Sequence, residues 1–206
     1  MNASRVRQRA KRGYTIVELV MSLAVLAIGA SGVIAMQKVA LSSNRHAKDL
    51  AVAARVGEAW ADQLAMDGST WTLTQAGAST LASTTWLSLA DPSQTVNWFV
   101  PAYSALRNFG PGFDVLGAPL DPSTSASLIR YCTHLRFAFL HNATGGSGVV
   151  RAQIRVFWPA DNVAGMPAAA RANLCAIDDA AFTANVGAFN VIYLTTSIAQ
   201  APAGLL

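Results

Sequence analysis

The carboxylate of Glu18 is the only charged side chain between Arg12 and Lys38. It follows Gly13 by five residues and immediately precedes an uncharged run of eighteen residues, 19–36. A carboxylate at the edge of so apolar a segment is costly unless a cation pairs with it. A cut after Gly13 would create such a cation, the α-amine of Tyr14. The Glu18 carboxylate is therefore expected to need a cationic partner, which the Tyr14 amine created by such a cut could supply.

The uncharged run is long enough to cross a membrane as a helix, because eighteen residues rise about 27 Å, close to the thickness of a hydrocarbon core. The residues before it, 1–13, contain five basic side chains and no acid. Such a basic flank is expected to stay in the cytoplasm. A secretory signal has a shorter apolar region with its cleavage site after it. Here Gly13 precedes the run, so cleavage there would remove the leader and leave the hydrophobic helix on the mature protein.

The charge balance points away from nucleic acid. The whole chain has a formal net charge of +4, with 15 basic and 11 acidic residues. Five of the basic residues belong to the leader, so residues 14–206 carry ten basic against eleven acidic side chains. The basic character is a property of the leader and gives no evidence for a DNA-binding surface.

The hydrophobic helix is expected to continue beyond the membrane. Residues 37–66 contain no proline and keep apolar side chains at three- and four-residue spacing. We therefore predict one helix over 14–66, with a membrane or filament-core half at 14–37 and an amphipathic half at 38–66. Asp67-Gly68-Ser69 is the predicted stop. Two helices with a break near Ser42-Ser43-Asn44 are the alternative.

A globular head is predicted over 67–206, beginning with a variable, loop-rich region at 67–128. Trp71, Trp86 and Trp98 in this region are expected to anchor a core, although a ligand platform built from them is the alternative. Residues 96–100 are a possible short strand.

An antiparallel sheet is predicted over 129–206. Alternating apolar and polar residues indicate strands at 128–140 and 150–158, joined as a hairpin by the Gly-rich loop 142–148. Residues 189–198 form a third candidate strand. The fold class is therefore α+β, with a long N-terminal helix packed on a C-terminal antiparallel sheet of three or four strands.

Catalytic motifs are absent from the sequence. It has no GxSxG elbow, HExxH motif or Walker loop, and its three histidines, His46, His134 and His141, are scattered. Asp178-Asp179 is interpreted as a solvated turn, with cation binding as the alternative. We predict that the chain is not an enzyme and needs no cofactor or metal.

The string from Arg12 to Val20, Arg-Gly-Tyr-Thr-Ile-Val-Glu-Leu-Val, resembles the class III signal of type IV pilins and type II secretion pseudopilins. The resemblance implies that prepilin peptidase cleaves between Gly13 and Tyr14 and that Tyr14 is N-methylated. It also implies that Glu18 is the assembly glutamate. Two departures are Tyr14, where the family usually has Phe, and Ala35, near a position where many pilins have a proline.

Residues 27–37 are similar to the small-residue and glycine pattern of PilV-type minor pilins. This resemblance implies a minor pilin that helps to initiate pilus assembly or joins a tip complex. Its implied partners are prepilin peptidase (also the methyltransferase), other minor and major pilins contacted through the N-terminal helix, and the inner-membrane assembly platform. The implied location is the bacterial inner membrane, with a single span and a periplasmic head, followed by the pilus at the cell surface.

Two other functions remain open. One is a type II secretion pseudopilin, and the other is an adhesin or binding module at the pilus tip.

Cys132 and Cys175 are the only cysteines, and a periplasmic head favours a disulfide between them. Metal binding by these cysteines with His134, or two free cysteines, are the alternatives.

Overall fold

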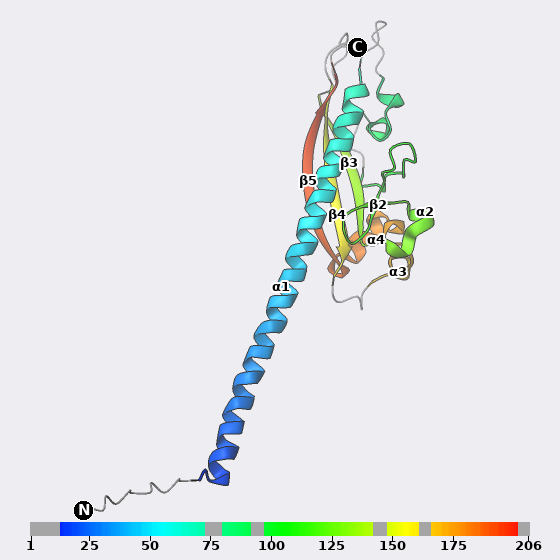
Figure 1. The fold of residues 1–206 in the computed structure, drawn as a ribbon. Coiled ribbons are helices and arrows are strands. Elements are labelled where there is room, and N and C mark those ends of the chain that lie inside the picture. The colour runs from blue at the N-terminus through cyan, green and yellow to red at the C-terminus, as the bar shows by residue number, and fades with distance from the viewer. Residues whose placement is uncertain (1–12, 73–79, 92–96, 142–147, 161–165, 202–206) are drawn as a thin grey trace, which may run out of the picture. The chain divides into compact units, whose positions relative to one another are not determined.

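The computed structural model describes residues 13–72, 80–91, 97–141, 148–160 and 166–201. The chain divides into two units, Met1–Ala47 and Lys48–Leu206. Helix α1 (Ile16–Thr70) contributes to both units (Figure 1). The helix is assigned without interruption at Ser42-Ser43-Asn44, so the predicted single helix is confirmed there.

The first unit, as far as it is described, consists of the N-terminal part of α1. Its best eighteen-residue window has a mean hydropathy of 2.3, and none of that window is buried. Large apolar side chains from Ile16 to Leu41 all remain exposed. A helix that is apolar around its whole circumference has no polar face to turn toward water, so this one needs lipid or other helices around it.

The second unit is built on a five-stranded antiparallel sheet in the order β2-β1-β3-β4-β5. The strands are β1 (Gly112–Phe113), β2 (Pro119–Leu120), β3 (Tyr131–His141), β4 (Val149–Pro159) and β5 (Phe189–Ala199). The three long strands are the predicted ones, and β3 and β4 form the predicted hairpin, paired from Cys132↔Phe157 to His141↔Val149. The intervening loop residues 142–147 lie outside the described residues.

One face of the sheet packs against the C-terminal part of α1. Successive strand residues alternate between faces, and Leu135 and Ile154 belong to the set that points toward the helix. They share a core with Val52, Val56 and Trp60 of α1. The helix residues recur at four-residue spacing, which places them on one side of the helix. Gly57 leaves room for Leu194 of β5, because a side chain at position 57 would collide with it.

The opposite face of the sheet is covered at one end by short helices. These are α3 (Ala168–Ala172), α4 (Asp179–Ala184) and the 3-10 turns η5 (Leu174–Ala176) and η6 (Val186–Ala188). Together with Cys132 and Phe157 they form a second buried cluster that includes Phe182 and Phe189. The remaining short elements are α2 (Pro122–Ser125) and the 3-10 turns η1 (Leu81–Ser83), η2 (Leu87–Leu89) and η3 (Ala126–Leu128).

Two sequence-based predictions need correction. The helix does not stop at Asp67-Gly68-Ser69 but continues to Thr70. Asp67 and Gly68 are buried, because the Asp67 carboxylate binds a later loop and Gly68 lies against Ile198 of β5. The predicted sheet of three or four strands has a fifth, because β1 and β2 arise inside the region expected to be loop. Residues 92–96 lie outside the described residues, and Phe99 makes only an isolated bridge to Leu135 within the rest of the predicted 96–100 strand.

A buried histidine links β3 to the cluster on the second face. The Nε2–H of His134 donates to the carbonyl oxygen of Ile177 at 3.0 Å, and its Nδ1 accepts from the Arg155 guanidinium. Arg155 in turn pairs with Asp179 at 2.8 Å. Burial, and then the Arg155 charge, lower the pKa of His134 from 6.5 to about 4, although Asp179 and Asp178 act in the opposite direction. The folded protein therefore holds this imidazole neutral.

This histidine makes stability depend on pH. Unfolded chains bind a proton at His134 below pH 6.5, whereas the folded chain resists protonation down to about pH 4, so stability falls as the pH falls through that window. We expect a loss of about 2–3 kcal/mol between pH 7.5 and pH 4.5 from this residue. Urea unfolding of the full chain in detergent, followed by tryptophan fluorescence, measures it. The His134→Gln variant should show a shallower pH dependence, and equal slopes in both proteins would disprove the assignment.

Candidate functional site

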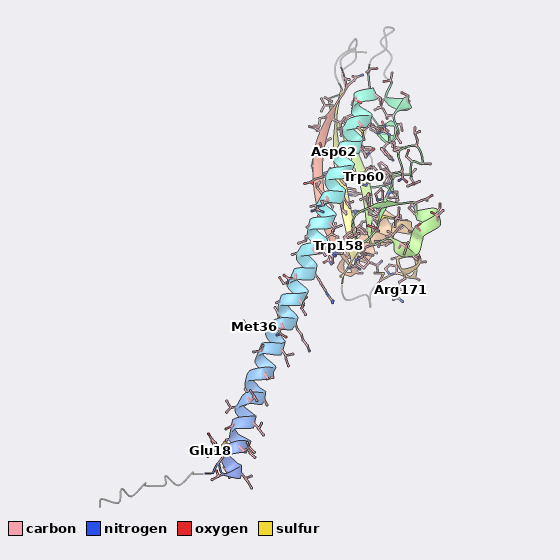
Figure 2. The ribbon with its side chains drawn as sticks, in the orientation of Figure 1. Glu18, Met36, Trp60, Asp62, Trp158 and Arg171 are labelled. Atoms are coloured by element: carbon pink, nitrogen blue, oxygen red, sulfur yellow. A yellow bond between two sulfur atoms is a disulfide. The ribbon has the colours of Figure 1, made fainter. Side chains whose placement is uncertain are left out.

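The predicted assembly residues lie at the start of α1. Gly13 and Tyr14 precede the helix in non-helical backbone, and both are exposed. A Cβ built on Gly13 has no other atom within 4 Å. The bond between Gly13 and Tyr14 is therefore open to an enzyme within the described part of the chain. Glu18, labelled in Figure 2, lies in the first turn of the helix.

The first turn of α1 is capped by Thr15. Its hydroxyl oxygen accepts from the Glu18 backbone N–H at 3.3 Å, and its carbonyl accepts from the Leu19 N–H at 3.2 Å. Thr15 and Glu18 thus stand at the first and fourth positions of a capping box, in which a glutamate or glutamine faces back toward the cap residue. The Thr-x-x-Glu spacing before an apolar run is the signal for this cap, a role that was not among the sequence-based predictions. A carboxylate in the first turn is also favoured by the helix dipole.

The surroundings of Glu18 decide what its carboxylate can do. Side chains before and after it, such as Val17, Leu19 and Met21, are apolar and more than half exposed. Glu18 makes no side-chain hydrogen bond or ion pair with any of the described residues. Once lipid or neighbouring helices cover this surface, water leaves and an unpaired carboxylate becomes costly. The turn therefore presents a carboxylate that is unpaired within the described residues and that a cation on another molecule could neutralise.

A family model described as the prokaryotic N-terminal methylation motif matches residues 8–34. The match includes Gly13, Tyr14 and Glu18 and extends through the apolar part of α1. Over these residues the chain carries a prepilin-type signal, as found in type IV pilins and pseudopilins. The long N-terminal helix and the C-terminal antiparallel sheet give it a pilin-like α+β arrangement. No curated protein and no solved structure matches the chain.

The membrane segment of this pilin-like protein agrees with the signal. Within the described residues, α1 is the helix long and apolar enough to cross a membrane, by length and composition. The motif and this helix together fit a membrane-anchored pilin and a structural subunit. They imply processing by prepilin peptidase and assembly with other pilins.

The cysteine pair is joined as predicted. Cys132 of β3 and Cys175 of η5 form a disulfide with a Cα–Cα distance of 5.4 Å. The bond ties the second-face cluster to the sheet across a sequence separation of 43, and loop closure of this size stabilises a fold by about 4 kcal/mol in the chain-entropy model. It also removes the alternative metal site, since both thiolates are consumed and both ring nitrogens of His134 have other partners.

The tryptophans lie mainly in the core. Trp71 is 2% exposed and Trp86 is 1% exposed, and Trp86 stacks edge-on against Trp60. Trp98 is half-buried beneath the Arg155 guanidinium, whose central carbon lies 4.7 Å from the ring centroid. The prediction that these tryptophans anchor the core is therefore correct for Trp71 and Trp86. The alternative of a ligand platform built from all three is wrong.

The remaining candidates have structural partners. Asp178 caps α4 by accepting from the Ala181 N–H at 2.8 Å, and Asp179 pairs with Arg155. The two residues begin helix α4, so the predicted solvated turn is wrong, and both carboxylates have partners within the protein. No group of three or more His, Cys, Asp or Glu side chains that could hold a metal occurs among the described residues.

Proposed function

We propose that this protein is a minor subunit of a type IV pilus, and that it works by assembly. It is held in the inner membrane by the first half of α1 with its head in the periplasm. Prepilin peptidase removes residues 1–13 and Tyr14 is N-methylated. The subunit then joins other pilins at the assembly platform, in the complex that initiates the filament or forms its tip.

One observation carries the proposal: Glu18 is the single charge on the exposed apolar stretch 16–37 of α1, one helical turn from the residue that becomes the N-terminus. Cleavage after Gly13 creates an α-amine at Tyr14. When two such helices stack in an apolar filament core, the Glu18 carboxylate of one and the Tyr14 amine of the other satisfy each other. The pair sets the axial register, while the apolar surface of α1 supplies the packing.

The alternatives receive less support. Burial of Trp71 and Trp86 counts against a tryptophan platform for adhesion. A type II secretion pseudopilin would use the same helix and the same ion pair. The pilus assignment depends on the similarity of residues 27–37 to PilV-type minor pilins, and it is tested by whether the protein is found in sheared pili.

The assembly role of Glu18 is tested by removing its charge in two ways. Glu18→Ala removes both the charge and the capping partner, whereas Glu18→Gln keeps a side chain that suits a capping box. We expect both variants to be processed normally and to reach the membrane at normal levels. Their amount in sheared pili should fall at least about tenfold, the factor that corresponds to losing roughly 1.4 kcal/mol.

Glu58→Ala is the matched control, because Glu58 is an exposed acid on the same helix but in the second unit. It should leave incorporation unchanged. If Glu18→Gln enters pili as well as the unaltered protein does, the carboxylate has only a capping role and the ion pair is wrong.

A further inference from the structure

Among the described residues, the short helices cover one end of the second sheet face and leave the side chains at its other end exposed or half-buried. We call this surface the open sheet face and define it by six residues, Arg136, Arg151, Gln153, Tyr193, Thr195 and Ser197. Cross-strand pairing places them together: Arg136 lies opposite Gln153, which lies opposite Thr195, and Arg151 lies opposite Ser197. Tyr193 belongs to the adjacent row, opposite Arg155. All six side chains therefore project from one face.

The two arginines of the open sheet face have no acidic partner among the described residues. The ion pairs in the described part of the chain belong to three other arginines, Arg107, Arg130 and Arg155. Arg136 and Arg151 make no hydrogen bond to the described residues, and the Nε of each is buried without a partner there. Their directly paired neighbours on this face, Gln153 for Arg136 and Ala138 and Ser197 for Arg151, are neutral, and the diagonal neighbour Arg155 is already paired with Asp179. Buried, unpaired guanidinium N–H groups are costly, so an anion bound here would offset an existing deficit.

The spacing of the two arginines suits a carboxylated ligand. Arg136 and Arg151 are diagonal neighbours across β3 and β4, and such positions lie about 7–8 Å apart. A guanidinium is a planar fork that matches the two oxygens of a carboxylate. Two forks at this separation can bind one acidic unit each or clamp a single one between them.

The other four residues indicate a sugar. Tyr193 is 58% exposed and lies 5.8 Å, centroid to centroid, from the Trp98 ring. Its ring face is electron-rich and apolar, so it suits the C–H face of a sugar ring. Gln153, Thr195 and Ser197 offer neutral donors and acceptors for hydroxyl groups.

Nucleic acid fits this surface less well. Its affinity comes chiefly from neutralising several phosphates with Lys and Arg, and the open sheet face has two unpaired cations against three neutral polar side chains. The open sheet face combines two arginines with no acid among their strand partners, the ring of Tyr193, and neutral amide and hydroxyl groups. This combination matches a polymer that carries one carboxylate per sugar.

We propose that the open sheet face binds an acidic oligosaccharide of the uronic acid class, through Arg136 and Arg151 to carboxylates and Tyr193 to a sugar ring. The other sheet face is occupied by α1 in the second unit.

The test is equilibrium binding by calorimetry, using the purified full-length chain in detergent. The probe is a de-esterified oligogalacturonate, and its methyl ester, which has the same shape without the charge, is the ligand control. We expect the acid to bind and the ester to bind at least about tenfold more weakly, in keeping with the loss of charge-assisted hydrogen bonds. Arg136→Gln and Arg151→Gln should each weaken binding of the acid by a similar factor.

Two more variants keep the result interpretable. Thr195→Glu changes an exposed side chain, so it should leave the fold intact while its carboxylate repels the ligand. Arg171→Gln removes an exposed charge from α3 and should leave binding unchanged (Figure 2). Failure to bind the acid, equal binding of acid and ester, an equal effect of Arg171→Gln, or tighter binding of an oligothymidylate of the same charge would each overturn the proposal. The assay needs no filament, so its result is independent of whether the chain enters a pilus.

Discussion

Replacing Asp67 by alanine is expected to destabilise the head by about 3–5 kcal/mol, as is typical when one partner of a buried ion pair is removed. Asp67 is fully buried on α1. One carboxylate oxygen accepts from the backbone N–H groups of Trp86 at 2.6 Å and Leu87 at 3.2 Å, and the other pairs with Arg107 at 2.7 Å. The variant leaves a guanidinium and two buried N–H groups without their acceptor.

The loss should also loosen the loop that these N–H groups belong to. Trp86 packs against Trp60 and Phe109, and the Arg107 guanidinium lies over the Trp86 ring at 5.3 Å. The Asp67 carboxylate joins the start of η2 to α1, and the variant lacks this connection. A loss of 3–5 kcal/mol is a large part of the stability of an ordinary domain, about 5–15 kcal/mol, so some of the variant is expected to be unfolded or degraded in cells.

Urea unfolding followed by tryptophan fluorescence measures this change, since every tryptophan lies within residues 60–158 of the second unit. Asp62→Ala is the matched control: it removes an exposed acid from the same helix (Figure 2) and should change stability by less than about 0.5 kcal/mol. Asp67→Asn keeps an oxygen that can accept from the two N–H groups, so its stability should lie between those of Asp67→Ala and Asp62→Ala. The free energy of unfolding of Asp67→Ala could instead lie within about 1 kcal/mol of the unaltered protein's, which is the net contribution of a single hydrogen bond. That result would show that the network contributes little to stability.

The parts of the fold that the sequence predicted are those with a strong local period. Alternation in residues 150–158 indicated β4 because one face of that strand is wholly buried against α1, so polar residues are confined to the other face. The helix was equally clear, because residues 14–66 contain no breaker strong enough to end it. Its C-terminus was wrong for a tertiary reason: Asp67 and Gly68 have the composition of a stop, but a distant loop and β5 use them as buried contacts.

Short elements and pairings over long distances could not be predicted in this way. β1 and β2 have two residues each, too few to show a period, and they exist because Gly112 and Phe113 pair with Cys132 and Tyr131. The open sheet face could not be predicted from the sequence for a similar reason. Arg136 and Arg151 looked like the ordinary polar side of two strands, and only the register and the positions of the acids show that they lack partners.

The candidate assembly site was predicted almost entirely from residue types and spacing, because its residues are close in sequence. Gly13, Tyr14 and Glu18 lie within six residues, so no knowledge of the fold is needed to bring them together. The structure adds the Thr15 cap and shows that Gly13 lies in exposed, non-helical backbone. Both findings bear on how cleavage after Gly13 can be tested.

Replacing Gly13 by arginine is expected to abolish processing. A Cβ at position 13 meets no atom within 4 Å apart from the neighbouring residues, and the position is exposed, so the variant should fold, and any loss of cleavage reflects recognition by the peptidase. The protein should then accumulate as a precursor about 1.5 kDa heavier than the mature form, the approximate mass of the thirteen-residue leader. Intact-mass analysis of the membrane fraction measures this, and in the unaltered protein it should also show one added methyl group at Tyr14.

Ala10→Arg is the control, because it adds the same charge to the leader without altering the residue at the cut, and it should be processed normally. Mature-sized protein from Gly13→Arg would disprove the cleavage site. The comparison with Glu18→Gln then separates two steps. An uncleaved chain has no Tyr14 amine, so its Glu18 has no complementary group to offer a neighbour, whereas Glu18→Gln has the amine but no carboxylate. If the ion pair drives assembly, both proteins stay out of pili, yet only the first retains its leader.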